Sequence, residues 1–99
     1  MIQRIVIFKL KDAYCNAEAR AEFADRTRKD LSALSQVRHV RVGVPADEAP
    51  EASWDIAITL EFDSLEDVKA YIVDPDHRAY VDDYASPKIE VRKAWNFEI

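Results

Sequence analysis

The sequence predicts an α+β fold of the split β-α-β, or ferredoxin-like, type, with the order β-α-β-β-α-β around one antiparallel sheet. Four segments alternate apolar and polar residues with the two-residue period of a strand. Two further segments place apolar residues at helical spacing, one after the first strand and one after the third. A chain of 99 residues has room for one core, so we expect a single domain over residues 1–99.

The composition narrows the possible functions. A net charge of −5, with basic residues interspersed among acidic ones, provides no surface for nucleic acid. The single glycine excludes a glycine-rich phosphate loop. One cysteine and two histidines show no metal-ligand spacing, and a lone cysteine suits a reducing compartment. No apolar run is long enough for a signal peptide or a membrane span. We therefore expect a cytoplasmic protein with no metal, no membrane contact and no nucleic-acid partner.

The first strand is predicted over residues 2–11, and the first helix over residues 17–34. The strand is apolar on both faces near its middle, so we expect other structure to cover each side. Asn16 is a suitable N-cap for the helix. Phe23 belongs to the apolar stripe of this helix, which makes it a core residue first and a ligand contact second.

Two strands follow, over residues 37–44 and 54–62, with an acidic loop containing two prolines between them. Ser64 is then placed to cap the second helix. Pro75 must interrupt this helix, and Asp74 can cap the part that follows. The last strand occupies residues 89–99.

Alternation leaves one face of the sheet without helices. Such a face, with apolar residues and charges of both signs, can pack against a copy of itself, although a solvated open face is the alternative. We expect Trp54, Trp95 and Phe97 to lie in the core or in an interface. The residues expected on the uncovered face are Ile5, Ile7, Lys9, His39, Arg41, Asp55, Ala57, Thr59, Glu61, Glu90, Arg92 and Ala94.

Three segments resemble the stress-responsive α/β-barrel (Dabb) family, within the dimeric α+β barrel superfamily. They are the strand Ile5–Lys11, the strand-to-helix run Asp55–Leu65, and the motif Tyr71-x-x-x-Pro75-x-His77. The resemblance covers nearly the whole chain. It implies a homodimer in which the two sheets form an α/β barrel, and a pocket in each protomer between the sheet and the helices.

The chain also resembles, distantly, the plant olivetolic acid cyclases of that family. The resemblance implies a cofactor-free cyclisation assisted by two histidines and a tyrosine. Tyr71 and His77 match two of these positions, whereas the third is Arg4. An arginine cannot act as a base at neutral pH, so this departure argues against the same cyclase reaction.

Arg4 shares a strand face with Val6 and Phe8, which alternation directs toward the helices. In a structural role it would reach water or pair with Asp74 or Asp76. In a functional role its guanidinium would bind a substrate carboxylate, enolate or phenolate, while a histidine accepts a proton and a tyrosine donates a hydrogen bond. The predicted catalytic residues are His77 and Tyr71, and the predicted ligand-binding residues are Arg4, Val6, Phe8, Phe23, Ile58, Tyr80 and Val81.

Three functions remain open from the sequence. The first is a homodimer whose pocket binds a small apolar or aromatic molecule. The second is a cofactor-independent lyase, cyclase or isomerase that uses His77 as its base on a polyketide-like or aromatic substrate. The third is a cofactor-free monooxygenase of the related ferredoxin-like type. None of the three requires a cofactor.

Overall fold

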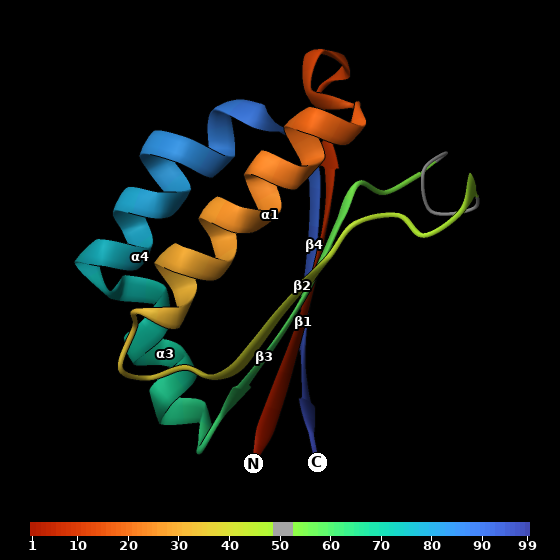
Figure 1. Ribbon diagram of the computed structural model, residues 1–99. Helices are drawn as coiled ribbons and strands as arrows, with labels where there is room; N and C mark the ends of the chain where they lie inside the picture. Colours follow the sequence, from red (N-terminus) through yellow and green to blue (C-terminus); the bar gives the residue numbers. More distant parts are fainter. Residues whose placement is uncertain (49–52) are drawn as a thin grey trace.

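The computed structural model describes residues 1–48 and 53–99 and has the predicted ferredoxin-like α+β fold. Figure 1 shows the helices packed on one side of the sheet, with the two chain ends close together. Residues 49–52, within the predicted acidic loop, lie outside the described part. The main elements are β1 (Ile2–Leu10), α1 (Ala17–Ser32), β2 (Arg38–Gly43), β3 (Ile56–Phe62), α3 (Leu65–Val73), α4 (Pro75–Ala79) and β4 (Ile89–Glu98). Three short segments complete the fold: the 3-10 turn η1 (Asp12–Tyr14), the π-helix η2 (Tyr80–Ala85) and the 3-10 turn η3 (Ser86–Lys88).

The four strands form an antiparallel sheet in the order β2-β3-β1-β4. The central strands β1 and β3 are paired over seven residues, from Ile2 opposite Phe62 to Phe8 opposite Ile56. The edge strand β2 carries an irregularity at His39, whose φ is 49°. Such an irregularity twists an edge strand and makes it a poor template for pairing with another chain.

The predicted helix caps are confirmed. The side chain of Asn16 accepts a hydrogen bond from the Ala19 amide at 2.8 Å, and that of Ser64 accepts one from the Asp67 amide at 3.3 Å. Both bonds satisfy amides that have no partner within the first turn of the helix. The first helix ends at Ser32, two residues before the predicted end.

The core lies between the helices and the covered face of the sheet. The ring of Phe23 on α1 meets the ring of Phe8 on β1 edge to face, with 5.8 Å between centroids. Phe23 and Leu31 on α1 are almost completely buried. The strand residues packed beneath them include Ile2, Val6, Phe8, Leu10, Ile56, Ile58, Leu60 and Phe62.

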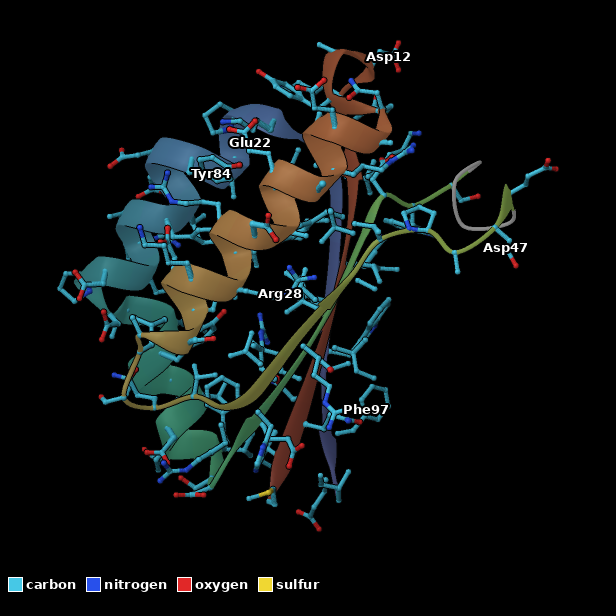
Figure 2. All side chains as sticks on the ribbon, in the orientation of Figure 1. Asp12, Glu22, Arg28, Asp47, Tyr84 and Phe97 are labelled. Carbon is cyan, nitrogen blue, oxygen red and sulfur yellow. The ribbon has the colours of Figure 1, made fainter. Side chains whose placement is uncertain are left out.

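Beyond the register shift near its start, the faces of the last strand are the reverse of those predicted. Ala94 pairs with Val6, so Ala94, Arg92 and Asn96 face the helices, while Trp95 pairs with Ile5 on the other face. Trp95 is 46% exposed and Phe97 is 50% exposed, and Figure 2 shows Phe97 on the side of the sheet away from the helices. Alternation defines two faces of a strand, whereas the pairing register decides which of them meets the core.

The sheet face without helices, called the open face below, is therefore more apolar than predicted. The central strand β1 contributes the partly buried Ile5 and Ile7, and β4 adds the exposed Val91, Trp95 and Phe97. Lys93 also lies on this face, opposite Ile7. A contiguous exposed apolar surface of this kind typically marks a contact with another molecule.

Asp55 was also expected on the open face, but it is only 2% exposed. Its Oδ1 accepts a hydrogen bond from Nε of Arg20 at 2.9 Å and forms an ion pair with Nη2 of Arg20 at 2.8 Å. Its Oδ2 accepts a hydrogen bond from the Leu10 amide at 2.7 Å. Asp55 lies just before β3 begins, where strand alternation no longer determines the direction of its side chain. The carboxylate joins α1 to the end of β1 and the start of β3.

A cavity between the sheet and the helices

A small cavity of about 40 Å³ lies between the covered face of the sheet and the helical layer. All of the predicted site residues line it except Phe23, which is packed between the rings of Phe8 and Tyr84. The cavity is lined by Arg4, Val6, Phe8, Leu31, Ile58, Leu60, Tyr71, His77, Tyr80, Val81, Arg92 and Ala94.

Asp74 positions His77 at the start of α4. Its Oδ1 accepts hydrogen bonds from the amides of Asp76 at 2.8 Å and His77 at 3.4 Å, as expected of the predicted N-cap. Its Oδ2 accepts a hydrogen bond from Gln36 at 3.0 Å. The Gln36 bond, followed by the amide bonds, lowers the pKa of the Asp74 carboxyl. Asp74 therefore holds the first turn of α4 in place as an anion.

The ring of His77 is buried and is anchored through one nitrogen. Nδ1 lies 3.4 Å from the carbonyl oxygen of Ile72, which can only accept, so Nδ1 carries the proton and Nε2 has a free lone pair. Burial lowers the pKa of His77, and the positive charges of Arg78 and Arg4 add to this effect, although the bond to Ile72 opposes it. His77 is therefore a neutral imidazole near pH 7 and can accept a proton.

Tyr71 lies directly against His77, with 4.0 Å between the ring centroids. On its other side, Tyr71 meets Phe62 edge to face at 5.1 Å. Burial raises the pKa of Tyr71 to about 12, even though the charges of Arg4 and Arg92 act to lower it. The phenol therefore remains protonated at neutral pH and can donate a hydrogen bond.

Arg4 is half-buried, and its hydrogen bonding is incomplete. Its Nη1 donates to Oδ1 of Asn96 at 2.9 Å, whereas its Nε is buried without a partner among the described residues. Burial lowers the pKa of Arg4, and the charge of Arg92 lowers it further. The structure pairs Arg4 with this neutral amide instead of Asp74 or Asp76, the acids considered from the sequence.

Tyr80 and Val81 line the cavity from η2, the π-helix that continues α4. The hydroxyl of Tyr80 forms a 2.6 Å hydrogen bond with Oγ1 of Thr27 on α1. Burial raises the pKa of Tyr80, so its hydroxyl is protonated as well. This bond joins the wall of the cavity to α1, and a π-helical turn is a common local adjustment next to a functional site.

Comparison with known proteins agrees with this fold. Residues 2–99 match the family described as the Stress responsive A/B Barrel Domain, or Dabb. The chain belongs to the Dabb family. A Dabb family protein with a ferredoxin-like fold from Mesorhizobium loti is 26% identical over 99% of this chain and 95% of that chain, with a TM-score of 0.81.

Two other solved structures are similar to this Dabb chain. A dimeric protein with a ferredoxin-like fold from Bacteroides fragilis is 27% identical over 99% of this chain and 95% of its own, with a TM-score of 0.78. A hydroxynitrile lyase from Passiflora edulis is 16% identical over 99% of this chain and 92% of its own, also with a TM-score of 0.78. No curated protein sequence matches the chain.

Four residues that line the cavity of this Dabb chain are not among those predicted from the sequence: Leu31, Leu60, Arg92 and Ala94. Leu31 and Leu60 are buried apolar residues, and no sequence feature distinguishes them from the rest of the core. Arg92 and Ala94 were placed on the wrong face of β4. Among the described residues that line the cavity, Arg92 is the only exposed one, so the entrance lies at the β4 edge of the sheet.

The cavity of the Dabb chain combines a neutral base, a protonated phenol and two guanidinium groups. None of the described residues that line it is an aspartate or glutamate. Within residues 1–48 and 53–99, no group of three or more metal-ligating side chains is placed to hold a metal ion. No helix in this part of the chain has the length and apolar character needed to cross a membrane. The arrangement is suited to taking a proton from a bound molecule and stabilising the resulting negative charge.

Proposed function

We propose that the cavity binds a small organic molecule and that His77 removes a proton from it in a cofactor-independent lyase or isomerase reaction. The observation that carries this proposal is the state of His77, which is neutral, anchored through Nδ1, and exposed to the cavity beside Arg4 and Tyr71. A base needs a pKa close to or below the working pH, together with a fixed orientation, and His77 has both.

The reaction begins when Nε2 of His77 takes a proton from a hydroxyl group or from a carbon next to a carbonyl. In a hydroxynitrile, the electron pair of the O–H bond then forms the C=O bond, and the C–C bond to the nitrile breaks as cyanide leaves with its electrons. In a ketone, His77 takes the proton from the α-carbon, the electron pair of that C–H bond forms the C=C bond of an enolate, and the carbonyl π electrons move onto the oxygen. Tyr71 donates a hydrogen bond to the new anion, and Arg4 stabilises its charge.

The dimensions of the cavity favour a compact substrate. A volume of about 40 Å³ has room for about three water molecules, well below that of a pocket for a drug-sized ligand. A larger aromatic molecule does not fit this volume unless side chains that line the cavity move. The Passiflora protein named as a hydroxynitrile lyase provides a first class of substrate to test, although its 16% identity supports the shared fold alone.

The test measures cyanide release from aliphatic and aromatic hydroxynitriles, and exchange of the α-hydrogens of small ketones and keto acids in D₂O. One of these reactions should proceed, with a rate that rises as pH increases and levels off above a pKa lower than 6.5. This direction follows because only neutral His77 is active. If neither reaction exceeds the rate without protein at any pH, the proposed chemistry is wrong.

Binding without chemistry is the second candidate, because the cavity is lined by apolar residues from β1 and β3 as well as by polar groups. In that case the same compounds shift the NMR signals of Tyr71 and His77, but no bond is broken.

Oxygen consumption with a reduced aromatic compound would instead indicate the cofactor-free monooxygenase considered from the sequence.

We further propose that this Dabb chain forms a homodimer through the open face of its sheet. The support is the exposure of Trp95 and Phe97 beside the partly buried Ile5. Large apolar side chains in this arrangement are stabilised when another surface covers them. The Bacteroides fragilis relative, at 27% identity, is described as dimeric.

Replacing Trp95 by Glu should convert the dimer to a monomer, because the new carboxylate would have to lose its hydration at the centre of the interface. Sedimentation velocity at micromolar concentration measures the change. Asp82→Ala, on the outer surface of η2, is the control and should leave the dimer intact. A wild-type protein that sediments as a monomer would contradict the proposal.

A further inference from the structure

Arg4 and Arg92 reach the same cavity from two neighbouring strands. Arg4 pairs with Asn96, and Arg92 lies four residues earlier on β4, which separates the two arginine positions by about 13 Å along the sheet. The Val6–Ala94 pair lies between them. Both side chains line the cavity, and the positive charge of Arg92 lowers the pKa of Arg4, after the larger effect of burial. This arrangement was not predicted, because simple alternation directs Arg92 to the open face, whereas its pairing with Phe8 directs it to the helix side.

The positive charge of this pair is not balanced by the surrounding protein. No described aspartate or glutamate lines the cavity or forms an ion pair with Arg4 or Arg92. The Nε of Arg4 is buried without a hydrogen-bond partner. Two cations that share a partly buried space repel each other, and a buried donor without a partner is costly, unless an anion joins them.

We propose that Arg4 and Arg92 together bind the carboxylate of a small organic acid, which identifies the substrate class of the reaction proposed above and rests on that proposal. A carboxylate is planar, accepts about four hydrogen bonds and fits the fork of a guanidinium group. The remaining walls, formed by Val6, Ile58 and Val81, are apolar and suit a short hydrocarbon body. Keto acids meet these requirements and carry an α-hydrogen for His77, whereas hydroxynitriles lack the charge.

Isobutyrate and its neutral isostere isobutyramide test the inference without depending on turnover. Binding is measured by NMR titration of the wild-type protein. Isobutyrate should bind at least about tenfold more tightly than the amide, since hydrogen bonds between charged groups are stronger than those to a neutral amide. Its affinity should also decrease as the salt concentration rises. Equal binding of the two compounds would overturn the inference, and so would tighter binding of inorganic phosphate.

Arg92→Gln should weaken isobutyrate binding about tenfold and leave the weak amide binding unchanged. The matched control is Lys69→Gln, which removes the same charge from the solvent-exposed surface of α3, away from the cavity and from the open face. Because Arg92 is exposed, the variant should fold, which circular dichroism verifies. If the two variants bind isobutyrate equally, Arg92 is not part of the site.

His77→Gln separates this inference from the proposed chemistry. The variant should still bind isobutyrate, because both arginines remain. Carboxylate binding in a wild-type protein that catalyses neither test reaction would refute the chemistry alone. Turnover of neutral substrates without preferential carboxylate binding would refute the anion site alone.

Discussion

Replacing Asp55 by Ala is expected to lower the free energy of unfolding by about 3–5 kcal/mol, the usual cost of removing one partner from a buried ion pair. Arg20 would lose its hydrogen bond and its ion pair with Oδ1, and the Leu10 amide would lose its hydrogen bond to Oδ2. Three elements of the fold would therefore lose a common contact. Urea unfolding followed by circular dichroism measures the change.

The exposed pair of Asp63 and Arg38 provides the control. Its atoms lie 3.1 Å apart, but both side chains are about half exposed, so water and salt screen their charges. Asp63→Ala should leave the unfolding midpoint nearly unchanged. A similar loss of stability in both variants would show that burial does not strengthen the contribution of Asp55.

Replacing His77 by Gln is expected to reduce the rate of the proposed reaction by about 10²–10⁴-fold, the usual contribution of a positioned general base. The glutamine amide can still donate to the Ile72 carbonyl, which keeps the local structure close to that of the histidine, but it cannot accept a proton near pH 7. Substrate binding should be retained, so the loss should appear in kcat.

His39→Asn is the matched control, because it replaces the other histidine of the chain. His39 is exposed on the edge strand with a positive φ that asparagine tolerates. This variant should react at the wild-type rate. If His77→Gln reacts equally fast, His77 is not the base, and the pocket would have only a binding role.

Most of the fold was predictable because the helix caps, the helix break and the strand alternation each depend on residues that are close together in the sequence. The caps at Asn16, Ser64 and Asp74 each depend on one side chain and the amides that follow it, and all three lie where the sequence places them. The break at Pro75 is equally local, since the ring removes a donor and fixes φ. Alternation in β1 correctly directed Arg4, Val6 and Phe8 to the helix side.

The remaining features depend on contacts between distant segments. β4 alternates clearly, yet either of its faces is compatible with that pattern, and only its pairing with β1 directs Arg92 and Ala94 toward the helices. Asp55 was misplaced because its burial depends on Arg20, 35 residues earlier in the chain. Neither position carries a local signal that would reveal these partners.

The proposed anion site and the proposed dimer interface both include residues of β4. Arg92 and Ala94 contact the cavity, whereas Lys93 and Trp95, which alternate with them, belong to the open face. A shift of this one strand therefore alters both the anion site and the contact with a second protomer. Ligand binding and dimerisation are then linked through β4. If a ligand strengthens the dimer by a given factor, the dimer binds that ligand more tightly than the monomer does by the same factor.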